Sequence, residues 1–317
     1  MLRLKQGIIC LGEALIDFIP TDETNLTYQK CPGGAPANVA VGVARLGVKS
    51  TFLGKLGNDV LGEFLKETLH DYGVDTSYLP LTSEAKTGVV FVTLAANGER
   101  SFEFFVDRSA DQLLSEEDMD ESLFEGSKLL HFGSISLIHE PSRSATIRAV
   151  ELAKKHGVLV SYDPNLRLGL WNSAEEARET ILSMMSHADI LKISEEELEF
   201  LTGHADIEQG LEALSIYNIP YIFVTLGAEG SYVAAGKNMS KVSAMKVQAV
   251  DTTGAGDAYV SGILYSFHEF NGAAATVSDL EQFAKFASVS GGLAASKKGA
   301  MTALPTLEQV LELAEKC

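Results

Sequence analysis

Short apolar runs alternate with amphipathic stretches along this chain, most regularly after residue 127. Apolar runs bounded by glycine or polar residues predict buried strands, and apolar residues three or four positions apart predict amphipathic helices. Strands are predicted over 7–11, 49–56, 128–132, 158–162, 190–193 and 221–225. Helices are predicted after the double glycine Gly33-Gly34 and over 59–72, 141–156, 174–185 and 258–267. This alternation indicates an α/β fold with a mostly parallel central sheet and helices on both faces, a three-layer α/β/α arrangement.

A second, smaller sheet is predicted near the N-terminus. The segments 88–94 and 101–106 are rich in β-forming residues and flank Asn97-Gly98, a strong hairpin signal. The segment 13–20 and the region around Tyr28 are also strand-like. We therefore expect a β-sheet lid made of 13–32 and 86–108, and a large domain made of 1–12, 33–85 and 109–317.

Composition and charge narrow the classes of partner. Hydrophobic residues make up 46% of the 317 residues and charged residues 21%, which is ordinary for a soluble globular enzyme. The formal net charge of −18 argues against a nucleic-acid or membrane binder. An anionic substrate must then meet a local positive site, such as a helix N-terminus, an arginine or a metal ion.

Cysteine and histidine usage gives no sign of a zinc site or of Ser/His nucleophilic catalysis. The three cysteines lie far apart without a CxxC pair, and the seven histidines show no ligand spacing. The N-terminal apolar run is too short for a signal peptide, and no apolar run approaches the ~20 residues that span a bilayer. We expect a cytoplasmic protein.

Polar residues gather where the predicted strands end. Ligands of open α/β sheets bind outside the carboxyl ends of the strands. The residues at such ends are Asp163, Asn165, Arg167, Ser194, Glu197, Thr225 and Gly227. This agreement of position is the strongest physical sign of a site.

The stretch from Asp251 to Asp257 (Asp-Thr-Thr-Gly-Ala-Gly-Asp) opens directly into an apolar helix. Gly254 and Gly256 allow positive φ angles and leave backbone N–H groups open to an anion at a positive helix N-terminus. Asp257 at its mouth could take a proton from an attacking hydroxyl. An aspartate that caps the helix beside a simple glycine turn is the plainer interpretation.

Four other residues have a structural and a functional interpretation. Asp17 lies in an apolar segment, where a buried carboxylate needs a partner or a ligand. Asn38 falls in the first turn of a helix, a common capping region. Glu197 belongs to a solvated acidic first turn or reaches Mg²⁺ through water. Arg167 is a surface ion-pair partner or grips a phosphate or sugar oxygen.

Two nucleotide-binding classes lack their motifs. No GxxxxGK[ST] sequence is present, so a P-loop enzyme is excluded. Tyr259 occupies the last glycine position of a possible GxGxxG pattern, so a nicotinamide dehydrogenase is weakly supported.

Several motifs in order resemble the ribokinase (PfkB) carbohydrate kinase family, and within it the fructokinases. The resemblance extends from about residue 7 to Pro305. The motifs are Gly33-Gly-Ala-Pro-Ala-Asn38-Val-Ala, Gly54-Lys-Leu-Gly57-Asn-Asp59, Asp163-Pro-Asn-Leu-Arg167, Val224-Thr-Leu-Gly-Ala-Glu-Gly230 and Asp251-Thr-Thr-Gly-Ala-Gly-Asp257. The combination of the first and last motifs is far more specific than either alone.

The resemblance implies a ribokinase-like fold and a role for each matching residue. Asp257 is implied to be the catalytic base, and Gly254, Ala255 and Gly256 the anion hole for the γ-phosphoryl group. The implied sugar contacts are Asp17, Gly34 and Asn38. We add Gly33, the lid residue Phe104 and Arg167 as expected sugar contacts. The implied nucleotide contacts are Ser194, Thr225, Gly227, Gly230, Gly256 and Ala287. Mg²⁺ is implied near Glu197, and a monovalent cation, usually K⁺, on the backbone of Asp251 and Thr253, with the Lys298-Gly299-Ala300 turn opposite.

Two departures from the family pattern matter. The usual Asn-x-x-Glu motif is Ser194-Glu-Glu-Glu197 here, which keeps the carboxylate and loses the amide. Ala35-Pro36 stands where ribose-specific members have Lys-Gly, and this favours a fructokinase.

The expected activity is ATP-dependent phosphorylation of a sugar primary hydroxyl, with fructose giving fructose 6-phosphate. Another ketose, ribose, 2-keto-3-deoxygluconate or a nucleoside remains an alternative acceptor. A catalytically silent regulator that binds sugar and nucleotide is an alternative of another class, although it would gain nothing from a base at Asp257. The half-covered lid sheet also predicts a homodimer formed lid to lid.

Overall fold

The computed structural model describes residues 5–95, 100–105 and 107–315. Its main sheet has eight strands. In spatial order these are β14 (Asn238–Val242), β13 (Ser231–Ala235), β12 (Tyr221–Thr225), β11 (Ile190–Ser194), β10 (Leu159–Tyr162), β9 (Leu129–Phe132), β1 (Ile8–Leu11) and β4 (Ser50–Leu53). The strands from β12 to β4 pair in parallel, whereas β13 and β14 form an antiparallel edge. The predicted mostly parallel sheet is confirmed.

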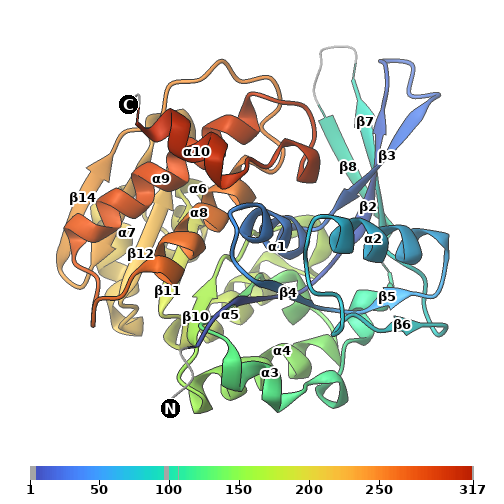
Figure 1. Cartoon of the computed structure of the whole chain (residues 1–317), viewed down its shortest axis with the longest axis horizontal. Helices are drawn as coiled ribbons and strands as arrows, with labels where there is room; N and C mark the ends of the chain where they lie inside the picture. Colours follow the sequence, from blue (N-terminus) through green and yellow to red (C-terminus); the bar gives the residue numbers. More distant parts are fainter. Residues whose placement is uncertain (1–4, 96–99, 106, 316–317) are drawn as a thin grey trace.

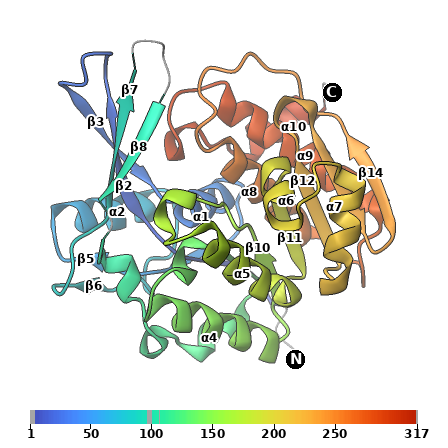
Figure 2. The ribbon, with the colours of Figure 1, turned by 180° about the vertical axis from the view of Figure 1, so that it is seen from behind.

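Helices cover both faces of this sheet (Figures 1 and 2). One face carries α1 (Ala35–Arg45), α2 (Val60–Asp71), α8 (Ala255–Glu269) and α9 (Val277–Ala295). The other carries α3 (Glu121–Gly126), α4 (Ser142–Lys155), α5 (Ala174–Met184), α6 (Glu195–Thr202) and α7 (Ile207–Leu214). The remaining helix, α10 (Leu307–Ala314), packs on α9. Strand β1 supplies both cores, because Ile8 and Cys10 face the first layer and Ile9 and Leu11 face the second.

A four-stranded sheet projects from the body in both views (Figures 1 and 2). Its order is β3 (Tyr28–Gly33), β2 (Leu15–Pro20), β7 (Val89–Leu94) and β8 (Arg100–Phe105). These strands are the segments expected to form the lid, with β3 reaching one residue further. The hairpin strands β7 and β8 pair antiparallel, while the predicted Asn97-Gly98 turn and Val106 lie outside the described residues.

The strand predicted over 49–56 is wrong in its second half. After β4 the chain leaves the main sheet at Gly54, and β5 (Leu56–Gly57) pairs with β6 (Leu81–Thr82) in a separate two-stranded sheet. A side-chain Cβ at Gly54 would lie 2.8 Å from the Gly12 carbonyl oxygen. Glycine at position 54 thus permits the close backbone approach to Gly12 at the point where β4 ends.

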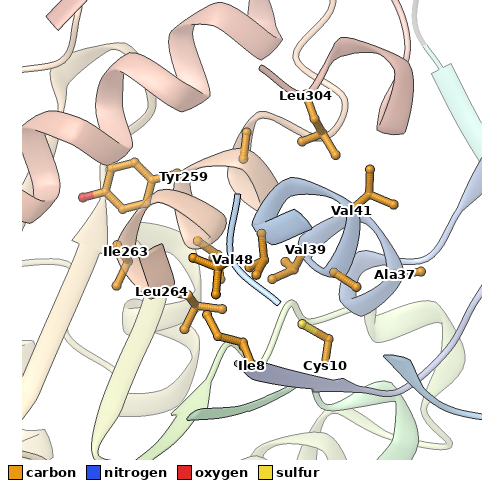
Figure 3. Packing of buried hydrophobic residues seen from close by; sticks show 14 of the residues in the cluster. Ile8, Cys10, Ala37, Val39, Val41, Val48, Tyr259, Ile263, Leu264 and Leu304 are labelled. Carbon is orange, nitrogen blue, oxygen red and sulfur yellow. The ribbon is translucent and has the colours of Figure 1, made fainter. Parts of the chain in front are cut away.

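The contact between α1 and α8 fixes the geometry of the site. Figure 3 shows side chains from β1, α1 and α8 gathered in one apolar cluster, with Val39 and Leu264 among them. A Cβ at Gly42 of α1 would lie only 2.2 Å from the Ser261 Oγ of α8. Only glycine therefore permits this distance between the helices, and the first turns of both are brought to one place.

Candidate active site

The first turns of α1 and α8 place Asn38 and Asp257 in contact. The Asn38 Nδ2 donates a hydrogen bond of 2.7 Å to the Asp257 Oδ2. Asn38 is the fourth residue of α1, and its side-chain oxygen Oδ1 accepts no hydrogen bond from the described residues, so it does not cap the helix. The capping interpretation of Asn38 is therefore wrong, and its amide holds the predicted base.

Asp257 faces a cavity of about 510 Å³ between the main body and the lid. Burial raises the pKa of Asp257 to about 6, the Asn38 hydrogen bond opposes that rise, and the charge of Asp163 adds to it. A carboxylate with such a pKa is ionised at neutral pH and still accepts a proton readily. The cavity lining includes the predicted residues Asp17, Gly34, Asn38, Phe104, Arg167, Thr253, Gly254, Gly256 and Asp257.

The lid supplies a second carboxylate. Asp17 lies on β2 and lines the cavity, and burial followed by repulsion from Asp257 raises its pKa to about 6. A Cβ at Gly33 would come within 2.2 Å of the Asp17 Oδ2. Gly33 thus leaves room for Asp17. It does not itself line the cavity, which differs from the direct sugar contact that was expected.

Gly34 links the lid to α1. Its φ of 102° lies in the region that favours glycine, and a Cβ there would lie 2.5 Å from the Glu13 carbonyl oxygen. The buried Glu13 side chain accepts a hydrogen bond of 3.1 Å from the Ala35 N–H at the start of α1. Burial raises the pKa of Glu13 to about 8. This role was not predicted, because in the sequence Glu13 only interrupts an apolar run.

The glycine turn before α8 has the form of an anion cradle. Gly254 begins the helix with a φ of 76°, and no side chain caps it. Gly256 and Asp257 lie in the first turn, where N–H groups have no partner within the helix. The Ala255 N–H instead donates to the Thr252 carbonyl at 3.1 Å. Within the cradle predicted over Gly254 to Gly256, the Ala255 N–H is therefore already engaged.

Asp251 braces the same turn. One of its carboxylate oxygens accepts hydrogen bonds from the Thr253 N–H and hydroxyl, at 3.1 and 2.7 Å. The other accepts from the Gly299 N–H at 3.2 Å. The two segments expected to border a monovalent cation are therefore joined through this side chain.

An ion pair between two strands was not predicted from the sequence. Lys192 of β11 lies 3.1 Å from the Asp163 carboxylate at the end of β10, and both line the cavity. Burial disfavours the charged form of Lys192, but Asp163 and Glu197 outweigh it and raise its pKa. Lys192 thus brings a fixed positive charge to the site.

Glu197 has a structural role in this structure. It forms a capping box with Ser194 at the start of α6, and its other oxygen accepts a 2.7 Å hydrogen bond from the Leu166 N–H. Burial raises its pKa, and the charge of Lys192 opposes this. No group of three or more His, Cys, Asp or Glu able to hold a metal ion occurs among the described residues. Mg²⁺ would then depend largely on phosphate oxygens and water.

Of the predicted nucleotide residues, only Gly256 is part of the cavity lining. Ser194 and Thr225 are paired at the carboxyl ends of β11 and β12, and Gly227 and Gly230 follow with φ of 53° and 108°. Ala287 is fully buried, against Gly262 of α8. It has no surface for a nucleotide, which differs from the predicted contact with adenine.

Arg167 is exposed and contributes to the electrostatics of both carboxylates. Its guanidinium donates to the Leu166 carbonyl at 3.0 Å. Its charge opposes the rise in the pKa of Asp17 and of Asp257. Arg167 also lines the cavity.

No helix within the described residues is long and apolar enough to cross a membrane.

Comparison with known proteins assigns the chain to a family. Residues 5–307 match the model of the pfkB family of carbohydrate kinases. Fructokinase-1 of Oryza sativa subsp. japonica is 46% identical over 315 residues, which cover 97% of each chain.

Solved structures agree with this match. A crystal structure of Vibrio cholerae O395 fructokinase with fructose, ADP and calcium is 42% identical, with a TM-score of 0.89 over 97% of this chain and 98% of that one. A double mutant of that enzyme holds fructose, ADP and potassium, with a TM-score of 0.87 at 41% identity over 98% and 99%. Xylella fastidiosa fructokinase with ATP gives a TM-score of 0.93 at 36% identity over 99% of both chains. The chain therefore belongs to the pfkB family of carbohydrate kinases.

Proposed function

We propose that this protein is an ATP-dependent fructokinase, which transfers the γ-phosphoryl group of ATP to a primary hydroxyl of fructose and gives fructose 6-phosphate. The observation that carries the proposal is the Asn38–Asp257 pair at the N-terminus of α8, facing a cavity closed by Asp17 of the lid. The similarity to fructokinases over nearly the whole chain supports fructose as the acceptor.

Asp257 acts as the base. The fructose hydroxyl oxygen forms a bond to the γ-phosphorus, the bond from that phosphorus to the bridging oxygen breaks, and ADP leaves with the electron pair. The hydroxyl proton goes to the Asp257 carboxylate, whose pKa of about 6 suits that transfer. The hydrogen bond from Asn38 keeps the carboxylate oriented while the proton moves.

The transferring group carries negative charge that the first turn of α8 can stabilise. The N–H groups of Gly256 and Asp257 point out of the helix end, where the helix dipole is positive. Lys192 adds a full positive charge beside this turn, because its Nζ lies 3.9 Å from the position that a Cβ of Gly256 would occupy. Phosphoryl transfer needs mainly such positioning and electrostatics, so these few groups suffice.

The sugar is held by groups from the lid and from the body. Asp17 accepts sugar hydroxyls, and Gly34 lets the sugar approach the backbone. Phe104 covers the sugar from β8, and Arg167 lies at the rim. Closing the lid over these groups would exclude water and suppress hydrolysis of ATP.

ATP binds along the carboxyl ends of β11 and β12, with Ser194, Thr225, Gly227 and Gly230 nearest to it. Mg²⁺ would neutralise the phosphate oxygens, and Glu197 would hold one of its waters through the acceptor capacity that its two hydrogen bonds leave. K⁺ would bind the backbone carbonyls of the braced turns at Asp251, Thr253 and Gly299. The ion-bound V. cholerae fructokinases support the use of nucleotide and cation.

The lid also forms the proposed contact of a homodimer. Phe105 of β8 is 54% exposed and lies against Phe91, with ring centroids 5.6 Å apart, on the face of the lid that points away from the sugar cavity. Pairing of two lids through this face would cover it. A sedimentation profile that shows only monomer at working concentrations would contradict this contact.

The proposed compartment is the cytoplasm. Cys10 and Cys31 are free thiols, as expected in a reducing environment. Fluorescence microscopy of a tagged full chain would test it, and an extracellular or organelle signal would contradict it.

Initial rates with Mg-ATP test the activity. Fructose, ribose, 2-keto-3-deoxygluconate and adenosine should be compared by release of ADP, with Asp257→Asn as the control. We expect the highest kcat/KM with fructose. A higher value with another acceptor would keep the kinase and change its substrate, whereas no turnover with any of them would favour a silent binding protein.

A further inference from the structure

The start of α1 cannot carry a cap of its own. Gly34 occupies the N-cap position, where the side chain of a serine, threonine, aspartate or asparagine usually accepts from the first N–H groups of a helix. A Cβ at Gly34 would lie 2.5 Å from the Glu13 carbonyl oxygen, so no capping side chain fits there. Helix α1 therefore depends on an acceptor from another segment.

Glu13 supplies this acceptor from 22 positions earlier in the chain. It lies between β1 of the main sheet and β2 of the lid and is 4% exposed. Its Oε1 accepts the hydrogen bond of 3.1 Å from the Ala35 N–H. A Cβ at Gly12 would lie 2.6 Å from the Pro36 Cγ, so the two backbone segments also pack closely beside this hydrogen bond. The crossing into the lid is thus joined to the first turn of α1.

A short series of contacts leads from Glu13 to the predicted base. Ala35 directly follows Gly34, whose carbonyl oxygen accepts a hydrogen bond of 2.8 Å from the Asn38 N–H one turn later. The Asn38 side chain then donates 2.7 Å to the Asp257 Oδ2. One helical turn therefore connects the Glu13 carboxyl with the Asp257 carboxylate.

Apolar packing holds α1 only beyond this polar start. Figure 3 shows Ala37, Val39 and Val41 among the side chains of the apolar cluster. Ala35 is half-buried and lies outside that cluster. Apolar contacts are non-directional, whereas the hydrogen bond from Asn38 to Asp257 requires a narrow range of distance and angle. The Glu13 contact is the directional restraint at this end of the helix.

We propose that Glu13 is a positioning residue for phosphoryl transfer, which holds the first turn of α1 so that Asn38 keeps the Asp257 carboxylate aimed at the sugar hydroxyl. The inference rests on the proposed fructokinase activity. Glu13 acts on the base through Asn38 and takes no part in the proton transfer itself.

The charge state of Glu13 provides a matched pair of variants. Burial raises the pKa of Glu13 to about 8, and the charges of Asp111 and Asp257 add to the rise. At neutral pH the side chain is therefore an uncharged carboxylic acid, and its carbonyl oxygen accepts from Ala35. Glutamine has the same shape and charge, so Glu13→Gln keeps the contact. Methionine is similar in length but its thioether is only a weak acceptor, so Glu13→Met removes it.

Initial rates at pH 7 with Mg-ATP and saturating fructose measure the effect on catalysis. Glu13→Met should lower kcat at least about tenfold and change the KM for ATP less than about twofold. Glu13→Gln should restore kcat to within about threefold of the wild type. Glu13→Asp withdraws the carboxyl by one methylene and should lower kcat in the same direction, which provides the test if Glu13→Met does not fold.

A double-mutant cycle separates positioning from general support of the fold. If Glu13 acts through Asn38, Glu13→Met should lower kcat less than about twofold further in an Asn38→Ala background. A role in folding alone predicts that the two losses multiply.

The titration of Asp257 tests the positioning without turnover. The hydrogen bond from Asn38 lowers the pKa of Asp257, so Glu13→Met should move the midpoint to higher pH by at least about half as much as Asn38→Ala does. The ¹³Cγ resonance of Asp257, identified by its loss in Asp257→Asn, reports this midpoint, and Glu13→Gln should leave it at the wild-type value. The titratable and charged groups around Asp257 are Glu13, Asp17, His131, Asp163, Arg167 and Lys192, of which only Glu13 differs between the wild type and the Glu13 variants.

Three results would overturn the inference. They are a folded Glu13→Met with kcat within about twofold of the wild type, losses that multiply in the Asn38→Ala background, and an Asp257 titration that Glu13→Met leaves unchanged. Failure of the proposed function is distinguishable, since the wild type would then release no ADP with fructose. The Asp257 titration still decides the role of Glu13 in that case.

Discussion

Replacing Asp257 with asparagine should abolish catalysis and stabilise the fold. The change removes the proposed base and one negative charge with little change in side-chain size. We expect kcat to fall by about 10²–10⁴, the usual contribution of a general base. The same change removes the cost of keeping a carboxylate in a desolvated site beside Asp163.

The structure gives the magnitude of the stabilisation. The pKa of Asp257 rises from 3.8 to about 6 on folding, and a rise of that size corresponds to about 3 kcal/mol of folding free energy once the carboxyl is ionised. Asp257 is half-buried, and the charged acceptor of Asn38 is lost in the variant. We therefore expect the free energy of unfolding to increase by about 1–2 kcal/mol at neutral pH.

The sign of the pH dependence follows from the raised pKa. Between about pH 4 and pH 6 the folded protein holds a proton on Asp257 that the unfolded chain has lost, so rising pH destabilises the wild type across this window. The gain in the variant should be small below pH 4 and complete above pH 6. Urea denaturation from pH 4 to pH 8 measures it, with Asp71→Asn at an exposed site as the control for charge. A variant that is inactive but less stable than the wild type at pH 7 would show that the ionised Asp257 carboxylate does not destabilise the folded protein.

Three further predictions concern the same site. Asp257 and Asp17 both have a pKa of about 6, and both are needed in the ionised form. The value of kcat/KM should therefore fall below pH 6 more steeply than a single ionisation produces. A flat profile down to pH 5 would contradict this. Gly33→Ala places a Cβ 2.2 Å from the Asp17 Oδ2 and should displace that carboxylate. We expect the fructose KM to rise at least about tenfold while the KM for ATP stays unchanged. An unchanged fructose KM would show that Asp17 does not bind sugar. Lys192→Met leaves the Asp163 carboxylate buried without its partner. The free energy of unfolding, measured by urea denaturation, should fall by about 3–5 kcal/mol. A fall of less than about 1 kcal/mol would contradict the ion pair.

Local sequence patterns predicted most of the parallel sheet, because each buried strand is a short apolar run between polar or glycine boundaries. The edge strands β13 and β14 were not predicted. For β14 the reason is that Asn238–Val242 is exposed on much of its length and carries no apolar run. Helix α9 was not predicted either. Its nineteen residues pack against α8 and the sheet edge, and the Gly291-Gly292 pair that permits close contact weakens the helical signal.

The catalytic end of the site was predicted from the glycine turn and its family resemblance, while its supporting contacts were not. The pairing of Lys192 with Asp163 joins residues 29 positions apart on neighbouring strands. A lysine inside the apolar run 190–194 requires a buried partner, yet one sequence does not say which carboxylate that is. The role of Glu13 depends on the path of the backbone into α1, because that path brings the Ala35 N–H to the Glu13 carboxylate. One sequence does not show this path.

The most direct test of the account is the product formed from fructose and Mg-ATP by the purified full chain. A coupled assay for fructose 6-phosphate, run beside ADP release for wild type and Asp257→Asn, measures it. We predict one fructose 6-phosphate for each ADP with the wild type and a rate lower by about 10²–10⁴ with the variant. Equal rates for the two proteins, or ADP release without fructose 6-phosphate, would contradict the assignment of Asp257 as the base of a fructokinase.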